Sequence, residues 1–291
     1  MTTLEDKNNG VIRSFDLSRT SVRIGYWVCF ACCVLILIVA VAPVLWVFLA
    51  SLKTLQEFTT EPSYLPKTWD FSRFAQTWNQ LDFVKYYINS FIVVIGAVVC
   101  AVVFNGLMAY GFSRVRPKGA NVVYYMVLWS MMIPATTALA PLFINITKLH
   151  LTNNFLPLWL AWGANAFYVI LYKNFFDDFP QSLIDAAHID GCSNLGIFFR
   201  IVMPLSMAIN VVIIIYAING AWSDFLLPYL VLGQSDKITV MVRLFVFRTA
   251  LHTNDIIMVR SVVFSIIPPI ILFAIFQRQI VEGITSTGIK G

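Results

Sequence analysis

Residues 26–50 read YWVCFACCVLILIVAVAPVLWVFLA, an apolar run without a single charged side chain. A helix that crosses a bilayer needs about 20 consecutive apolar residues, so this run predicts a membrane-spanning helix. The whole chain is 59% hydrophobic and 12% charged, with a mean hydropathy of +0.77. That leaves too little polar surface to cover a water-soluble globule. We therefore expect an all-α, polytopic membrane protein.

Six apolar runs are long enough to be spans, and an even number places both termini on one side of the membrane. The fifth run is interrupted at Asn219 and Gly220, and the last is short and contains Pro268 and Pro269. Such irregularities are typical of helices around a translocation pathway. The six expected spans are residues 26–50, 87–111, 122–144, 155–171, 201–232 and 261–276.

Positive charge in the short loops sets the expected orientation, because cytoplasmic loops are rich in Lys and Arg. The first tail and the second loop are basic, whereas the third loop has only Lys148. Both termini should therefore be cytoplasmic. The organisation that follows is a cytoplasmic tail (1–25), a first span (26–50), an external loop (51–86), a transmembrane core (87–278) and a second cytoplasmic tail (279–291).

The external loop is rich in aromatic side chains, including Trp69, Phe71 and Trp78. They predict either an aromatic layer at the membrane interface or a docking surface for an external partner. The net charge of +5 does not indicate nucleic-acid binding, since the basic residues are scattered and form no stripe. Four of the five cysteines lie in apolar runs, and we interpret the cluster of Cys29, Cys32 and Cys33 as apolar filler rather than a metal or redox site.

The fourth loop departs from the orientation rule because it is acidic where a cytoplasmic loop should be basic. Pro180 stands where a helix can begin, and Ser182 precedes Asp185 by three residues, which predicts a capping box. A short helix over residues 182–191 follows, with Gly191 ending it in the left-handed conformation and Ser193 capping the next helix. The acidic residues of this loop are Asp177, Asp178, Asp185 and Asp190.

One face of this short helix is smooth and apolar. At 100° per residue its apolar and small residues share one arc, and Asp185 and His188 face the other way. A helix this short is marginal alone in water, so we expect the apolar face to rest in a groove of a cytoplasmic partner. The chain then runs through Ile201 and Pro204 into the fifth span, as a rigid lever. The face comprises Leu183, Ile184, Ala186, Ala187 and Gly191.

These residues, with their spacing, resemble the EAA loop of ABC importer permeases. The matching pattern is Asp-Ala-Ala at 185–187, Gly191, and Ile-x-Met-Pro at 201–204. Asp185, Cys192 and Met203 replace the family's usual Glu, Ala and Leu. The resemblance implies that the loop couples the permease to its ATPase, through Asp185, Ala186, Ala187, Asp190, Gly191, Ile201 and Pro204.

Further segments resemble the carbohydrate branch of that family, of the maltose and glycerol-phosphate type, over nearly the whole chain. They include Tyr-Ile-Asn-Ser at 87–90, Ala-Tyr-Gly-Phe-Ser-Arg at 109–114, Ile-Pro at 133–134 and Trp-Ser-Asp-Phe at 222–225. The resemblance implies a bacterial or archaeal inner-membrane heterodimer with a second permease subunit. It also implies two cytosolic ATPase subunits that bind ATP and Mg, an external solute-binding protein, and no cofactor in this chain.

Catalytic motifs are missing from the sequence. No G-x-x-x-x-G-K-[ST] phosphate loop occurs, and the Gly-rich segment 283–288 is followed by Ile289 rather than Lys. An intramembrane Ser and His hydrolase is disfavoured, because the three His residues all fall in expected loops. We therefore expect a transport protein rather than an enzyme.

Polar residues inside the expected spans are candidates for the solute pathway. Uncharged amides suit a hydroxyl-rich solute, but they also form hydrogen bonds between helices, and both interpretations stay open. Asn210 has the same ambiguity, whereas Trp162, Tyr216 and Trp222 either stack on a sugar face or mark the membrane interface. An ion-coupled carrier or channel is the alternative, and the coupling loop argues against it. The candidate pathway residues are Asn105, Asn165, Asn219, Trp222 and Asp224.

Overall fold

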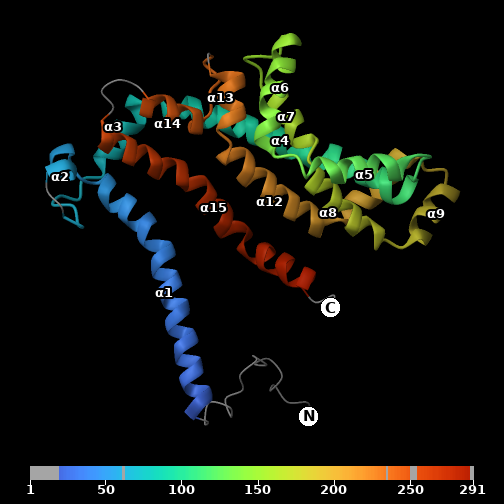
Figure 1. Ribbon diagram of the computed structural model, residues 1–291, viewed down its shortest axis with the longest axis horizontal. Coiled ribbons are helices and arrows are strands. Elements are labelled where there is room, and N and C mark those ends of the chain that lie inside the picture. The colour runs from blue at the N-terminus through green and yellow to red at the C-terminus, as the bar shows by residue number, and fades with distance from the viewer. Residues whose placement is uncertain (1–19, 61–62, 234, 250–253, 289–291) are drawn as a thin grey trace. The chain divides into compact units, whose positions relative to one another are not determined.

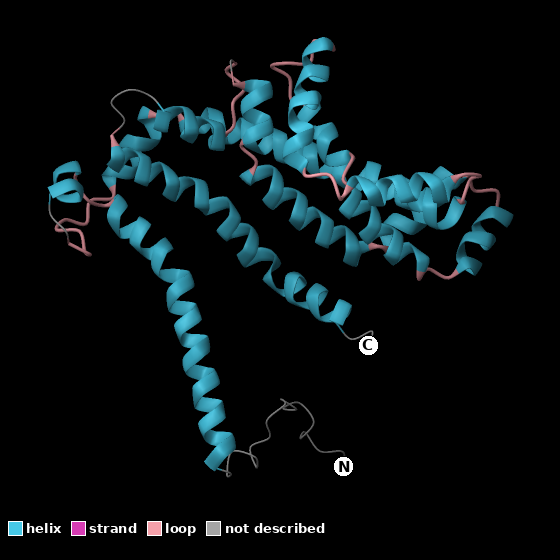
Figure 2. Ribbon diagram, in the orientation of Figure 1, coloured by secondary structure: helices cyan, strands magenta, loops and turns pink. Residues whose placement is uncertain are grey.

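The structure is a computed structural model that describes residues 20–60, 63–233, 235–249 and 254–288. These residues form helices joined by loops and contain no strand (Figure 2). The chain divides into two compact units, residues 1–71 and residues 72–291, and each is described by itself. The all-helical class with several apolar helices is that of a polytopic membrane protein.

The first unit is dominated by α1 (Thr20–Ser51), which contains the expected first span. Its side chains are exposed along almost the whole helix, and only Ala50 and Ser51 are buried. A helix that is apolar on all sides and uncovered by protein requires lipid around it. After α1, the short α2 (Leu55–Thr60) is held by its buried Glu57, whose Oε1 accepts the backbone N–H of Lys67 at 2.6 Å.

In the second unit, α3 (Ser72–Gln80) precedes the long central helix α4 (Phe83–Tyr110), which continues into one π-helical turn, η2 (Gly111–Val115). Three later helices, α7 (Leu156–Gly163), α8 (Ala166–Asp177) and α12 (Met207–Ser223), all pack against α4 (Figure 1). Small residues on α4, among them Ala97, Ala101 and Ala109, are fully buried and let these helices approach closely.

The expected third and fourth spans are not continuous helices, which corrects the sequence prediction. The third consists of α5 (Ala120–Ser130) and α6 (Ala135–Lys148), bent by 109°. Pro134 stands at this break and lacks the N–H that would continue the helix. The fourth consists of α7 (Leu156–Gly163) and α8 (Ala166–Asp177), where Asn165 begins the second helix.

The expected interruption of the fifth span at Asn219 and Gly220 is also wrong. The segment α12 (Met207–Ser223) runs through both residues, and the break comes at Asp224, before α13 (Leu226–Leu232). Gly220 has a packing role, because the Trp162 ring lies where its side chain would be. Before α12, the chain forms α10 (Asn194–Ile197), η3 (Phe198–Val202) and α11 (Met203–Leu205), bent by 85° from α12.

The last helices are α14 (Val240–Thr249) and α15 (Asp255–Gly288). The expected short sixth span is wrong in length, since α15 has 34 residues and continues through Pro268 and Pro269. Among the described residues, three helices are long and apolar enough to cross a membrane, or up to five if each bent pair is one span. Six spans therefore remain a prediction.

The start of α4 is tied to the segment before α14. Asn89 donates through Nδ2 to the carbonyl oxygens of Asp236 and Ile238, at 3.0 and 3.1 Å. Ser90 Oγ accepts the backbone N–H of Val240 at 2.9 Å. The polar pair of the Tyr-Ile-Asn-Ser segment thus satisfies backbone groups that would otherwise be unpaired in an apolar surrounding.

Gly220 offers a test of the packing between α12 and the Trp162 ring of α7. A Cβ atom there would lie inside van der Waals contact of the Trp162 ring, whereas a Cβ at Gly111 meets nothing within 4 Å. Gly220→Ala should destabilise the subunit by about 1–3 kcal/mol, because the ring must leave its position. Gly111→Ala should be neutral or stabilising. Thermal unfolding midpoints in detergent would show this, and equal midpoints for the two variants would contradict it.

Candidate functional site

The fourth loop contains the expected helix, α9 (Gln181–Ile189), between α8 and α10. Pro180, where the sequence indicated that a helix can begin, is its N-cap residue and has an extended backbone. The predicted capping box is wrong, because the helix already begins at Gln181 and Ser182 lies inside the first turn. Asp185 instead accepts a hydrogen bond from Gln181 Nε2 at 3.0 Å.

The end of α9 forms as the sequence predicted. Gly191 has φ +81°, a conformation that costs a glycine least. This turn lets the N–H of Cys192 reach the carbonyl oxygen of Ala187 at 2.9 Å, which satisfies one of the last carbonyls of the helix. Ser193 then caps α10, accepting the N–H of Gly196 at 3.2 Å.

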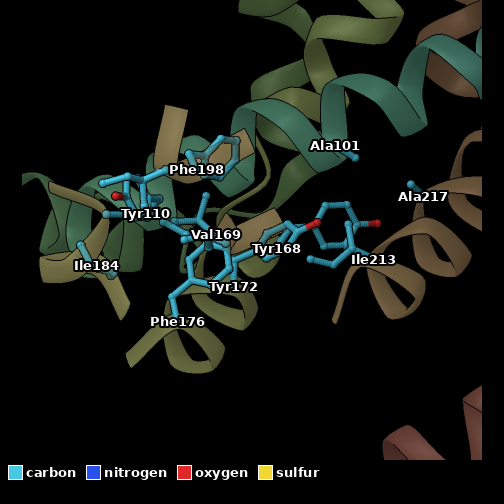
Figure 3. Packing of buried hydrophobic residues seen from close by; sticks show 14 residues of the cluster. Ala101, Tyr110, Tyr168, Val169, Tyr172, Phe176, Ile184, Phe198, Ile213 and Ala217 are labelled. Atoms are coloured by element: carbon cyan, nitrogen blue, oxygen red, sulfur yellow. The ribbon is translucent and has the colours of Figure 1, made fainter. Parts of the chain in front are cut away.

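The apolar residues of α9 do not all share one free face, which corrects the sequence interpretation. Ile184 and Ala187 are buried in this chain's own core, where Ile184 joins Tyr110, Phe176 and Phe198 (Figure 3). Hydrophobic periodicity cannot tell a side chain buried in its own subunit from one awaiting a partner.

An apolar surface nevertheless remains on the outer side of this loop. Leu183 and Ala186 are exposed, and Ile189 is 87% exposed. Leu195, at the start of α10, is exposed as well. Asp185, Asp190 and Gly191 lie on the exposed part of the loop among these residues.

The expected lever from the loop to the fifth span is bent rather than straight. Ile201 packs on the core cluster, Pro204 is exposed in α11, and the bend follows at Ser206. Asn210 stabilises the bend, because its Nδ2 donates to the Met203 carbonyl oxygen at 2.8 Å. Its Oδ1 accepts the hydroxyl of Tyr172 at 2.9 Å, so Asn210 connects helices within the core.

A polar cluster beside α9 escaped the sequence interpretation. Ser113, on η2, donates to Asp177 Oδ1 at 2.6 Å, and Lys173 Nζ lies 2.6 Å from Asp177 Oδ2. Partial burial acts to raise the pKa of Asp177. The hydrogen bonds from Lys173 and Ser113, with the charges of Lys173 and Arg116, outweigh burial and hold that pKa below its ordinary value. Asp177 is therefore a paired anion, which accounts for part of the acidity of this loop.

Arg114, which the sequence indicated as a loop charge and as the last residue of the family-like segment 109–114, contacts three backbone or side-chain oxygens next to α9. Its Nε donates to the carbonyl oxygen of Phe176 at 2.9 Å, and its Nη2 donates to those of Phe176 and Phe179, the latter at 2.6 Å. Its Nη1 donates to Gln181 Oε1 at 3.0 Å. The resemblance of the segment 109–114 to the family marked Arg114 in the sequence but did not indicate its partners, which lie more than sixty positions away.

A second candidate site lies beside the break between α7 and α8 and the break between α12 and α13. An open cavity of about 290 Å³ brings together Asn165 and Asp224 from the predicted pathway residues, and Trp162 also lines it. The Asp224 carboxylate also faces the backbone N–H groups at the start of α13. The remaining lining residues are mostly apolar: Ala135, Thr136, Leu139, Ala161, Leu226 and Leu227.

The other candidate pathway residues lie elsewhere. Asn105 is fully buried, with Nδ2 donating to the carbonyl oxygens of Ala101 and Trp162 and Oδ1 accepting the N–H of Asn165. Trp222 is buried and donates to the Ser265 carbonyl oxygen at 3.0 Å. Asn219 is exposed on α12 and does not line the cavity. For Asn105 and Trp222 the contacts favour a structural role.

Comparison with known proteins decides the family. The sequence pattern of the family described as "Binding-protein-dependent transport system inner membrane component" matches residues 101–286. This chain belongs to that family. It is 32% identical to the probable ABC transporter permease protein YurM of Bacillus subtilis, over 88% of this chain and 86% of YurM. It is 30% identical to the arabinooligosaccharides transport system permease protein AraQ of Bacillus subtilis, over 86% and 90% of the two chains.

A solved structure shares the fold of this permease. A chain in the crystal structure of a bacterial ABC transporter involved in the import of the acidic polysaccharide alginate superimposes with a TM-score of 0.80. The match covers 89% of this chain and 98% of that chain, at 24% identity. The resemblance to ABC importer permeases is therefore confirmed, and an ion-coupled carrier is not supported. The roles of individual residues remain predictions.

The two neighbouring alanines of α9 give a matched test of the site geometry. Ala187 is 5% exposed within the core, whereas Ala186 is exposed. Ala187→Glu should bury an unpaired carboxylate and cost roughly 3–5 kcal/mol, so the amount of folded permease in the membrane should fall sharply. Ala186→Glu should leave that amount unchanged. Size-exclusion chromatography of a fluorescent fusion would measure it, and equal yields would mean that Ala187 is not enclosed as described.

Proposed function

We propose that this permease imports a sugar or a related polyhydroxylated solute, and that α9 is the element through which separate ATPase subunits drive it. The observation that supports this is the construction of α9. One side is built into the core through Ile184 and Ala187, and the other leaves Leu183 and Ile189 exposed. Exposed apolar side chains in contiguous groups mark interaction surfaces.

The partners follow from the family. A second permease subunit would complete a heterodimeric pathway, and two cytosolic ATPase subunits would bind ATP and Mg. An external solute-binding protein would deliver the solute. In this arrangement the chain crosses the inner membrane of a bacterium or archaeon six times, with both termini and α9 in the cytoplasm, in accord with the basic tail and loop.

The sugar class rests on the cavity and on the relatives. Trp162 offers an aromatic face, and Asn165 and Asp224 offer groups that hydrogen-bond to hydroxyls. Similar proteins include the diacetylchitobiose uptake system permease protein NgcG of Streptomyces coelicolor, as well as AraQ. We therefore place a hydroxyl-rich solute on the path beside these residues.

The coupling role predicts a specific loss at the exposed surface of α9. Ile189→Asp should leave the permease folded, because Ile189 is 87% exposed. A charge placed in an apolar contact should weaken ATPase binding by about tenfold or more. Co-purification of the ATPase subunits and solute-stimulated ATP hydrolysis in reconstituted complexes would measure the effect.

Asp185→Glu is the matched control, since it keeps the charge at an exposed position of the same helix. It should leave both readouts near the wild-type level. If Ile189→Asp retains full ATPase binding and hydrolysis in a folded subunit, α9 is not the coupling element.

The solute class is tested by uptake of labelled sugars in cells with and without this subunit. Oligosaccharides such as diacetylchitobiose and arabinotriose should enter only when the subunit is present. Vanadate should stop uptake, whereas a protonophore in ATP-clamped vesicles should not, because the energy comes from ATP. Uptake that follows the proton gradient instead would contradict an ATP-driven permease, and uptake of no sugar would contradict the solute class.

A further inference from the structure

Arg114 occupies a position from which one side chain can hold three helices together. It belongs to η2, the π-helical turn at the end of α4. Its guanidinium binds the carbonyl oxygens of Phe176, in the last turn of α8, and of Phe179, in the turn that follows, and the side chain of Gln181, the first residue of α9. The ends of α4 and α8 and the start of α9 therefore meet at a single cation.

The chemistry of this site requires arginine rather than any positive charge. The last carbonyls of a helix have no partner within it, and they carry the negative end of the helix dipole. A guanidinium is planar and offers five donors in a fixed fork, so it can bind two carbonyls and an amide together. A lysine ammonium in the same place is a compact point charge on a flexible stem.

A second connection joins the same two helix ends. Ser113, which is fully buried beside Arg114, donates to Asp177 Oδ1 at 2.6 Å. Lys173, one turn earlier on α8, holds the other carboxylate oxygen of Asp177. The end of α8 is thus fixed to η2 by two neighbouring residues, Ser113 and Arg114.

Between α8 and α9 lies only the short turn at residues 178–180. Without a connection across this turn, the start of α9 would be held only through the buried Ile184 and Ala187, and it could tilt about the turn when a partner pushes on its exposed side. With Arg114 in place, the start of α9 is fixed to α4, against which α7, α8 and α12 pack.

We propose that Arg114 is a positioning residue for transport, which makes α9 move together with the ends of α4 and α8 rather than pivot at the turn. The proposal rests on the coupling role proposed for α9. It assigns Arg114 no contact with the solute or with ATP. Its loss should reduce the solute molecules imported per ATP hydrolysed, and leave ATPase binding in place.

Arg114→Lys tests this in proteoliposomes that contain the whole complex and the best-transported sugar of the uptake panel. The number of sugars imported per ATP should fall roughly three- to tenfold, since the forked hydrogen bonds are lost and the charge is kept. Arg116→Lys is the matched control, because Arg116 Nε bonds to the Ser113 carbonyl oxygen within its own turn and not to α9. Its ratio should be unchanged.

Gln181→Ala separates positioning from a purely structural cap of α8. Gln181 is exposed, so its loss should spare folding yet lower the import ratio about threefold. The double variant with Arg114→Lys should be no worse than Arg114→Lys alone, because both substitutions remove the same connection between Arg114 and Gln181. Additive losses, or a normal ratio in either single variant, would overturn the proposal. If Arg114→Lys does not assemble, the ratio of Gln181→Ala decides alone.

Ile189→Asp, measured in parallel, keeps the two proposals apart. If Ile189→Asp retains wild-type ATPase binding, the coupling role of α9 fails and the role of Arg114 fails with it. If Ile189→Asp loses ATPase binding but Arg114→Lys imports at the wild-type ratio, only the positioning role is overturned.

Discussion

The side chain of Asn105 satisfies the backbone at the break between α7 and α8, and the position of both candidate sites depends on it. The break frees the carbonyl oxygen of Trp162 and the N–H of Asn165, and Asn105 binds both from the middle of α4, at 2.9 Å each. A bilayer offers no water to take the place of these bonds. The break therefore forms where α4 supplies an amide, which fixes the start of α8 and one wall of the cavity.

Close packing of helices around α4 depends on small residues. Gly96 leaves room for the ring of Trp159, whose Nε1 donates to the carbonyl oxygen of Ile92, and Gly220 leaves room for Trp162. In lipid there is no hydrophobic drive to bring helices together, so contact depends on such fit and on hydrogen bonds. The two tryptophans of α7 are thus packing elements, and only Trp162 also reaches the cavity.

The sequence predicted what depends on local chemistry. The apolar run of α1, the start of α9 at Pro180 and the left-handed Gly191 follow from composition and single-residue conformation. It failed where a residue serves a distant partner. Gly220 resembles a helix interruption until the ring of Trp162 fills its place. Asn105 resembles a pathway residue until its partners on α7 and α8 are known, and the bonds of Arg114 cross more than sixty positions.

The sequence shows one wide apolar arc on α9 because some of its apolar residues are buried in this subunit and others are exposed. A helix with the coupling role proposed for α9 must be held by its own subunit and pushed by another, so it needs apolar residues on both sides. Ile184 and Ala187 meet a core that includes Phe176 of α8, Phe198 of η3 and Ile213 of α12. This core is close-packed and therefore poorly compressible. A displacement applied at Leu183 or Ile189 would then reach α8, which follows the break after α7, and α12, which precedes the break at Asp224, without a flexible step between.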